Sequence, residues 1–198
     1  FEGPQHGFAR DLPHTLTDQG EDFLCFRLNW PGSENWPWPF TLDTEHRLLK
    51  DGAVTTCTVT NTGAEPMALQ LGFHPGFRCP FVEGTAAADY QVRFANGRVV
   101  PLTEHLFDND SIPYENVGPW ARLEHRDSGE FIQVGTEGFF RVLLWSKPGI
   151  PGFLCIEPWQ GFPGPQRELD HRPGAVVLSP GEEKSWKQEI KLEMKKAA

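Results

Sequence analysis

Hydrophobic and polar residues alternate with a period of two along several short stretches of the chain. In residues 53–60, valine, threonine and cysteine side chains alternate between two faces, and in residues 186–194 a lysine or glutamate follows every second residue. A period of two places successive side chains on opposite faces of a β-strand. No stretch of twelve or more residues carries the apolar stripe of an amphipathic helix. The pattern therefore predicts β-structure throughout.

Turn residues separate the predicted strands at short intervals. Asp51-Gly52, Asn96-Gly97 and Ser128-Gly129 each lie between two strand-like runs, which is typical of a tight β-hairpin. For Asp51-Gly52 we expect a two-residue type I′ turn. The fold class expected is all-β, a sandwich or barrel of antiparallel strands at residues 23–29, 41–50, 53–60, 67–73, 90–94, 98–102, 121–126, 130–135, 140–145, 153–156 and 186–194.

Composition narrows the class of protein. The length of 198 residues fits one domain that spans residues 1–198. The net charge is −9 and no basic cluster exceeds Lys195-Lys196, which argues against nucleic acid and membrane surfaces as partners, because both require a cationic patch. No apolar run could cross a bilayer, and we expect no secretory signal. The four cysteines lack the spacing of zinc ligands, so we expect no metal, reduced thiols and a cytoplasmic protein.

Two ionisable residues each follow an apolar run and precede a proline. Glu157 follows residues 153–156 and precedes Pro158, and His74 follows residues 67–73 and precedes Pro75. A residue before proline is pushed out of the α region into an extended conformation. We therefore expect both side chains at the ends of strands that open into loops. A carboxylate and an imidazole form a natural base and acid near neutral pH.

Each of these residues also has a structural interpretation. An isolated strand-end glutamate is more often paired with an arginine, and an isolated histidine such as His6 is more often a surface side chain. Trp30, Trp36 and Trp38 fit a rigid loop packed on the core better than a stacking platform for a ligand. The chain has no nucleotide-binding, zinc-protease or serine-nucleophile motif. Aromatic residues near acidic and imidazole groups then favour a carbohydrate site.

Three segments carry a resemblance to a known family. His6-Gly7-Phe8-Ala9-Arg10, Gly72-Phe73-His74-Pro75 and Glu157-Pro158-Trp159 occur in this order and at this spacing. Together they resemble the aldose 1-epimerase (galactose mutarotase-like) superfamily, and PQHGFAR, GFHPGF and CIEPW most resemble its LacX-like branch. The resemblance covers nearly the whole chain. It implies an antiparallel β-supersandwich with an open sugar-binding cleft, and cofactor-independent ring opening of a free hexose at C1, rotation and re-closure.

The resemblance also implies a role for each residue of these motifs. Glu157 matches the base that takes the proton from the C1 hydroxyl, and His74 matches the acid that protonates the ring oxygen. His6 matches a second histidine that holds and polarises the sugar. Arg10 would bind sugar hydroxyls or hold Glu157.

Two further substrate-binding residues are expected. Trp159 would offer an aromatic face to the sugar. An acidic sugar-binding residue is expected between the second and third motifs, and Asp110 is the candidate in residues 106–110. The resemblance implies no metal and no nucleotide.

Other functions stay open from the sequence. A phosphohexose epimerase of the same family would need extra cations at the cleft, for which Arg78 and Arg93 are the nearby candidates. A carbohydrate-binding or regulatory domain could keep the pocket without turnover, although a pure binder has no need of an acid/base pair. Members of the family usually have several strands before the first motif, so we expect a fold that lacks these N-terminal strands, either because the sequence is part of a longer protein or because the protein is a shortened member. A homodimer could cover the edges thereby exposed.

Overall fold

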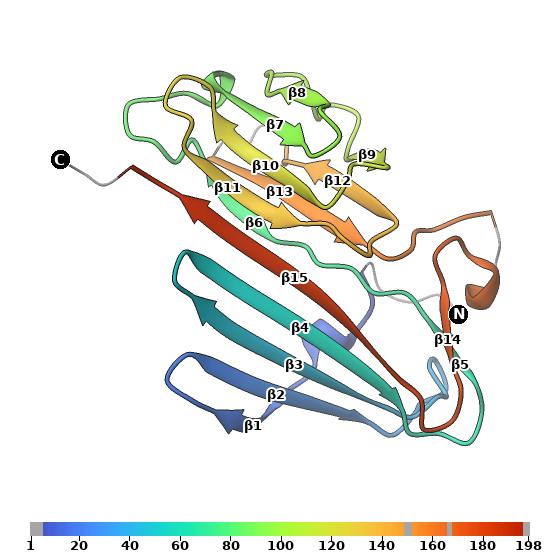
Figure 1. Ribbon diagram of the computed structural model, residues 1–198. Helices are drawn as coiled ribbons and strands as arrows, with labels where there is room; N and C mark the ends of the chain where they lie inside the picture. Colours follow the sequence, from blue (N-terminus) through green and yellow to red (C-terminus); the bar gives the residue numbers. More distant parts are fainter. Residues whose placement is uncertain (1–5, 149–151, 166–167, 196–198) are drawn as a thin grey trace. The chain divides into compact units, whose positions relative to one another are not determined.

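The computed structural model describes residues 6–148, 152–165 and 168–195 (Figure 1). In this part of the chain the regular structure consists of β-strands and three short 3₁₀ turns, without an α-helix. All strand pairs described are antiparallel, which confirms the predicted all-β class. The chain divides into two compact units. The first comprises Phe1–Leu69, Gln166–His171 and Ala175–Lys187, and the second comprises Gln70–Pro165, Arg172–Gly174 and Gln188–Ala198. A single domain over residues 1–198 stays a prediction.

The first unit is built on a meander of four strands. β1 (Thr15–Gln19), β2 (Phe23–Trp30), β3 (Phe40–Leu49) and β4 (Gly52–Asn61) pair in chain order, and the first part of β15 (Glu183–Glu193) follows β4 in the sheet. β5 (Met67–Leu69) pairs separately with β14 (Val176–Leu178). The 3₁₀ turns η1 (Ala9–Asp11) and η3 (Leu169–His171) also belong to this unit.

The β3–β4 hairpin is confirmed, but the predicted turn is wrong by one residue. Leu49 pairs with Gly52, so Lys50 and Asp51 form the two-residue loop and Gly52 begins β4. None of these residues has the positive φ that a type I′ turn requires. Gly52 is therefore the first paired residue of β4 and not a residue of the turn.

Asn61, the last residue of β4, joins three segments of the first unit. Its side chain is fully buried. The amide nitrogen donates to the carbonyl oxygens of Glu65 and Leu178, at 2.8 and 2.9 Å. The amide oxygen accepts the N–H of Gly63 at 2.9 Å. These bonds satisfy both donor positions and one acceptor position of the amide, which offsets the cost of burying it.

The second unit contains two antiparallel sheets with a shared core. In one sheet the later part of β15 pairs with β11 (Phe131–Gly135), followed by β10 (Trp120–His125), β7 (Tyr90–Phe94) and β8 (Val99–Pro101). The other sheet has the order β6 (Gly76–Cys79), β13 (Gly152–Trp159), β12 (Arg141–Trp145) and β9 (Ile112–Glu115), and the turn η2 (Ala87–Asp89) precedes β7. The core between these strands includes Tyr90, Val92, Phe94, Ala121, Leu123, Val134, Val142, Leu144, Leu154 and Ile156.

The longer predicted strands are present, and the missed strands are short. β1, β6, β9 and β14 have three to five residues each, too few to display a period. Of the strand predicted at residues 67–73, only Met67–Leu69 forms. The hairpins at Asn96-Gly97 and Ser128-Gly129 are confirmed, with Gly97 and Gly129 at φ 88° and 75°.

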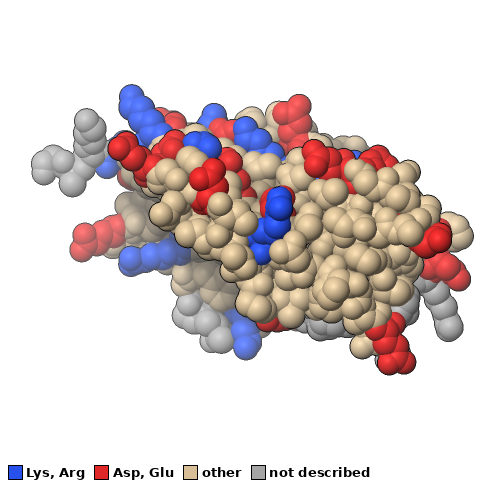
Figure 2. All heavy atoms as spheres, turned by 90° about the horizontal axis from the view of Figure 1, so that it is seen from below, with Lys and Arg blue, Asp and Glu red and all other residues tan. Residues whose placement is uncertain are grey.

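The cysteines and the charged side chains complete the description of the fold. All four cysteines, each in the described part of the chain, are free. No helix in the described ranges has the length and apolar character needed to cross a bilayer. Figure 2 shows acidic and basic side chains interspersed on the face that it displays, with no continuous basic patch among the described residues there.

Candidate active site

Glu157 lies inside β13 rather than at its end. It pairs with Leu143 of β12, and β13 continues to Trp159. The prediction that Glu157 ends its strand is therefore wrong. Pro158 has no N–H to donate, but its carbonyl oxygen accepts the N–H of Phe73 at 2.9 Å. The strand can continue through Pro158 because the N–H that proline lacks would face this irregular segment. No regular ladder of hydrogen bonds is broken there by its absence.

The segment between β5 and β6 holds His74 beside β13. The N–H of Phe73 donates to Pro158, and the carbonyl oxygen of Pro75 accepts the N–H of Ile156 at 3.3 Å. These bonds flank His74 and tie its backbone to β13 on both sides. The predicted strand-end position is wrong, because β5 ends at Leu69 and His74 follows it in an irregular segment.

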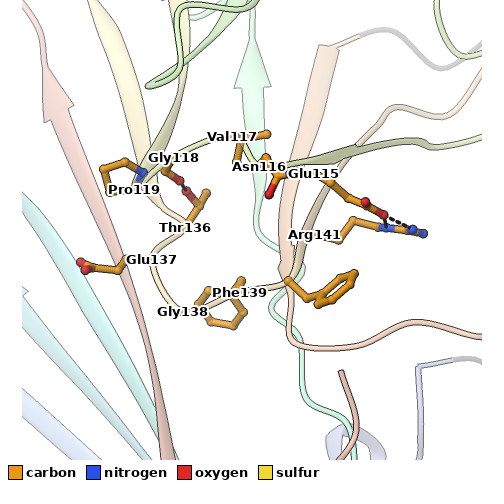
Figure 3. Close-up of a pocket in the computed structure, with 11 residues that line it drawn as sticks. Glu115, Asn116, Val117, Gly118, Pro119, Thr136, Glu137, Gly138, Phe139 and Arg141 are labelled. Atoms are coloured by element: carbon orange, nitrogen blue, oxygen red, sulfur yellow. Dashed lines mark hydrogen bonds and ion pairs between the residues drawn. The ribbon is translucent and has the colours of Figure 1, made fainter. Parts of the chain in front are cut away.

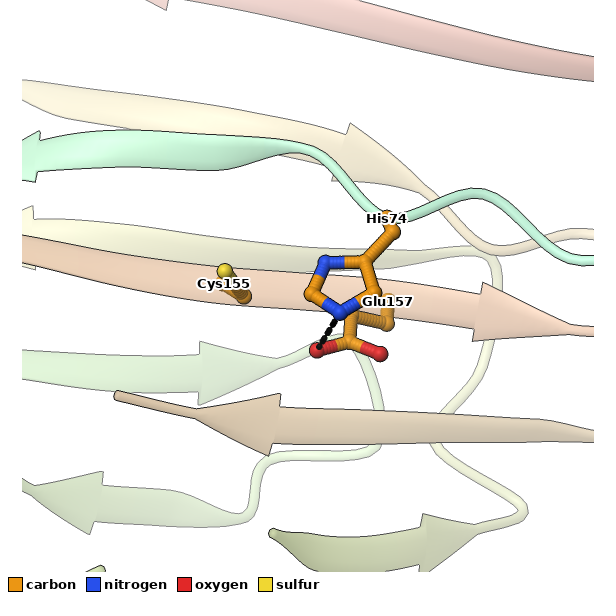
Figure 4. Close-up of side chains that lie close together, drawn as sticks. All are labelled: His74, Cys155 and Glu157. Carbon is orange, nitrogen blue, oxygen red and sulfur yellow. Dashed lines mark ion pairs between the residues drawn. The ribbon is translucent and has the colours of Figure 1, made fainter. Parts of the chain in front are cut away.

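The imidazole of His74 and the carboxylate of Glu157 form a close pair (Figure 4). Nε2 of His74 lies 3.3 Å from Oε1 of Glu157. The His74 side chain is 37% exposed, whereas that of Glu157 is 3% exposed. Trp145 meets the imidazole edge-on, with ring centroids 6.1 Å apart. A small ligand arriving from solvent would meet the imidazole first and the carboxylate behind it.

Burial sets the protonation of this carboxylate. It raises the pKa of Glu157 from 4.5 to about 7. A hydrogen bond from the Trp159 side chain lowers this pKa, and the negative charge of Asp110 raises it. Near neutral pH, Glu157 can therefore both accept and return a proton, as a general base in a reversible reaction must.

Trp159 orients Glu157 from the same strand. The two residues lie two positions apart on β13, so their side chains project from the same face. The indole N–H is the only polar group of a tryptophan side chain, so it is the donor of the hydrogen bond to Glu157. Gly72 makes room for the indole, since a Cβ at this position would lie 2.8 Å from Cδ1 of Trp159.

Alternate residues of β12 and β13 project from the same side of the sheet as Glu157, since residues opposite one another in an antiparallel pair share a face. We call this surface the site face. Four intervening residues point into the core, namely Val142, Leu144, Leu154 and Ile156. The site face consists of Cys155, Glu157 and Trp159 of β13 and of Arg141, Leu143 and Trp145 of β12.

Arg141 is fixed at one end of the site face. Its guanidinium forms an ion pair with Glu115 of β9 and lies over the ring of Phe162, 3.5 Å from the centroid. Arg141 and Glu115 also border a cavity of about 620 Å³, which His74 and Glu157 do not line (Figure 3). The cavity is lined by Glu115, Asn116, Val117, Gly118, Pro119, Thr136, Glu137, Gly138, Phe139, Phe140 and Arg141.

Asp110 adopts a backbone conformation that is uncommon for residues other than glycine. Its φ is 80°, and its N–H donates to the carbonyl oxygen of Phe107 at 3.0 Å. Its charge acts on Glu157, so its carboxylate is within electrostatic reach of the pair. Its sugar-binding role stays a prediction.

His6 and Arg10 belong to the first unit. His6 has a φ of 65° and is exposed, and Arg10 lies in η1. Phe8 between them packs on Trp30, with ring centroids 4.6 Å apart, and Trp30 donates its indole N–H to the Trp36 carbonyl oxygen at 3.0 Å. These contacts match the interpretation of the tryptophan segment as a packed loop. The roles that the resemblance implies for His6 and Arg10 stay predictions.

The two arginines considered for phosphate binding differ in their surroundings. Arg93 forms an ion pair with Glu124 at 2.8 Å, in the β7–β10 pair. Arg78 is exposed and pairs in register with Phe153, which lies two residues before Cys155 on the same side of β13. Of the two, only Arg78 adjoins the site face by register.

A buried carboxylate and an accessible imidazole lie 3.3 Å apart beside the aromatic side chains of Trp145 and Trp159, an arrangement that can carry out acid/base chemistry. Residues 2–120, more than half of the chain, match the family described as aldose 1-epimerase. The chain belongs to this family.

Comparison with individual proteins agrees with the family. The chain is 26% identical to the LacX protein of Lactococcus lactis subsp. lactis, over 89% of this chain and 70% of that protein. A galactose mutarotase related enzyme from Lactobacillus acidophilus superposes with a TM-score of 0.88 at 23% identity, over 98% of this chain and 75% of the other. A galactose mutarotase-like protein from Lactobacillus casei superposes with a TM-score of 0.84 at 25% identity, over 98% and 77%. The predicted galactose mutarotase-like fold is thereby confirmed.

Sequence reasoning missed three residues of the site. Trp145 beside His74, Cys155 beside Glu157 and Arg141 beside Trp159 were recognised only as strand residues. The alternation that places these residues on one face of β12 or β13 is visible in the sequence. The register that brings the two strands together is not.

Proposed function

We propose that this protein interconverts the α and β anomers of a free hexose. The observation that carries the proposal is the pair formed by His74 and Glu157, with 3.3 Å between Nε2 and Oε1, in a chain of the aldose 1-epimerase family. The two groups lie close together, so both can reach the oxygen atoms bonded to C1 of a bound sugar, one the hydroxyl oxygen and the other the ring oxygen.

The pair can carry out each proton transfer of the reaction. Glu157 accepts the proton of the C1 hydroxyl while the bond between C1 and the ring oxygen breaks, and His74 gives a proton to that ring oxygen. The product is the open-chain aldehyde. Rotation about the C1–C2 bond presents the other face of the carbonyl. The ring oxygen then attacks C1 and returns its proton to His74, and Glu157 returns its proton to O1.

The environment of each group supports its role. Burial keeps the pKa of Glu157 near 7, so the carboxylate binds a proton strongly enough to take it from a hydroxyl. Trp159 fixes the carboxylate through its indole N–H. Trp145 and Trp159, both partly exposed on the site face, offer aromatic surface to the apolar side of a sugar ring.

Polarimetry tests the proposal. Freshly dissolved α-glucose and α-galactose should reach their equilibrium rotation faster with wild-type protein than in buffer alone. Calorimetry on the same samples separates an enzyme from a binder, since binding without acceleration would overturn the proposal in favour of a non-catalytic sugar-binding domain. A hexose 6-phosphate as a third substrate, with an Arg78→Ala variant beside wild type, tests the phosphohexose alternative.

A further inference from the structure

His74 and Glu157 share their location with a third side chain that has metal-binding chemistry. The Sγ atom of Cys155, Nε2 or Nδ1 of His74 and a carboxylate oxygen of Glu157 all lie within 4.8 Å of one another (Figure 4). Cys155 and Glu157 are two residues apart on one face of β13. Both are buried, at 4% and 2% exposed.

The separation of the nitrogen and oxygen ligand atoms fits a compact tetrahedral ion. Zn–N and Zn–O bonds of about 2.0–2.1 Å place the ligand atoms about 3.3–3.4 Å apart, and Nε2 of His74 lies 3.3 Å from Oε1 of Glu157. A Zn–S bond of about 2.3 Å requires the sulfur about 3.6 Å from the other two ligand atoms. The sulfur lies within 4.8 Å of both atoms, so metal binding would require the Cys155 side chain to move to that separation.

The scaffold holds the three ligands in place. Two backbone hydrogen bonds to β13 flank His74, and β13 itself presents the other two residues from a paired strand. Gly76 lies opposite Cys155 on β6, where even a Cβ would come no closer than 3.4 Å to Sγ. No side chain from β6 therefore covers the sulfur at that position.

We propose that His74, Cys155 and Glu157 form a binding site for a borderline-soft divalent cation such as Zn²⁺, and that the bound ion blocks the acid/base pair. A nitrogen, a sulfur and an oxygen ligand suit Zn²⁺ and Co²⁺, whereas Mg²⁺ and Ca²⁺ prefer oxygen alone. Three protein ligands leave a fourth position for water. Binding does not depend on the proposed function, but the block of turnover rests on it.

Binding requires a proton to leave the thiol. Burial and the charge of Glu157 raise the pKa of Cys155 to about 11, so the free protein carries the thiol rather than the thiolate. As the metal–sulfur bond forms, the thiol proton passes to solvent. The ion also takes the carboxylate oxygen and the imidazole nitrogen that the reaction uses, which explains why it would inhibit.

Co²⁺ spectroscopy of the full chain tests the site. Wild type titrated with Co²⁺ should develop a thiolate-to-metal charge-transfer band and tetrahedral d–d bands at one ion per chain, and Zn²⁺ should displace them. Cys155→Ala should lose the charge-transfer band. Cys25→Ala is the matched control, since the Cys25 thiol also lies beside a carboxylate, 3.7 Å from Oε2 of Glu45, and this variant should keep the band. Absence of the band in wild type, or its persistence in Cys155→Ala, would overturn the proposal.

Polarimetry on the same proteins separates this inference from the proposed function. Zn²⁺ should slow anomer interconversion by wild type, and slow Cys155→Ala less, each relative to its own metal-free rate. A band without interconversion would reject the proposed function and keep the metal site. Interconversion without a band would reject the metal site alone.

Discussion

At the scale of single residues, the proposed function depends on Glu157, whose environment decides when its carboxylate can accept a proton. Burial favours the neutral carboxyl and raises the pKa of Glu157 to about 7. An exposed glutamate would be ionised from about pH 5 upward. The base form of Glu157 is instead lost on mild acidification.

The first prediction is a pH profile. Below about pH 7, kcat/KM for α-glucose or α-galactose should fall about tenfold per pH unit, because only ionised Glu157 accepts the C1 hydroxyl proton. The measurement is polarimetry across pH 5–8 with the spontaneous rate subtracted. A profile that stays flat down to pH 5 would show that a group with an ordinary carboxyl pKa acts instead.

The second prediction concerns the two neighbours of Glu157. Trp159 lowers the pKa of Glu157 and Asp110 raises it. Trp159→Phe should therefore move the acidic limb of the profile to higher pH, and Asp110→Asn should move it to lower pH. The Asp110→Asn shift should be the smaller of the two, because Asp110 is exposed and its charge is screened. Shifts in the same direction in both variants would contradict this electrostatic description.

At the scale of elements, β13 and the segment before β6 build the pair together. Sequence reasoning identified the two ionisable residues and the prolines that follow them. It could not show that Phe73 and Pro75 bond to β13 on either side of His74, since these contacts join positions about 80 residues apart in the chain. Proline suggested strand ends, whereas tertiary pairing kept Pro158 within a strand.

The third prediction tests the close approach of this segment to Trp159. In Gly72→Ala the new Cβ would lie 2.8 Å from Cδ1 of Trp159, so the indole must shift and its hydrogen bond to Glu157 must weaken. We expect a lower kcat/KM and an acidic limb at higher pH.

Gly135→Ala is the control for this variant. Its Cβ would meet Glu189 at an ordinary 3.5 Å, and the pH profile should not move. Equal effects of the two substitutions would show that the contact at Gly72 has no special role.

At the scale of the whole molecule, periodicity and turn residues were sufficient to predict an all-β antiparallel fold. The short hairpin between β7 and β8 follows from the local signal Asn96-Gly97, whose glycine takes the positive φ expected. The four missed strands are short, and their pairing depends on neighbours rather than on their own residues. The order of the three family motifs predicted the fold family, but not the register that assembles the site face.

The fourth prediction links Glu157 to the stability of the whole chain. The folded-state pKa of about 7 exceeds the ordinary value of 4.5, so the stabilising contribution is complete below pH 4.5 and is lost as the pH rises through 7. The difference of about 2.5 pKa units corresponds to roughly 3 kcal/mol. Relative to Glu157→Gln, which does not titrate, wild type should lose about that much unfolding free energy between pH 4 and pH 8.

Urea unfolding of both proteins at several pH values measures this difference. Parallel stability curves for wild type and Glu157→Gln would contradict the raised pKa. A gap that widens toward acid pH, with wild type increasingly less stable than Glu157→Gln, would contradict its sign.

The central claim is that Glu157 and His74 transfer the protons of anomer interconversion. Exchange between the α and β C1 proton signals of glucose or galactose, followed by NMR with wild type and Glu157→Gln, tests it most directly. The variant should fold and bind the sugar. Its enzymatic exchange rate should be at least about a hundredfold lower, because a positioned base contributes about that factor. A Glu157→Gln protein that exchanges the anomers as fast as wild type would contradict the claim.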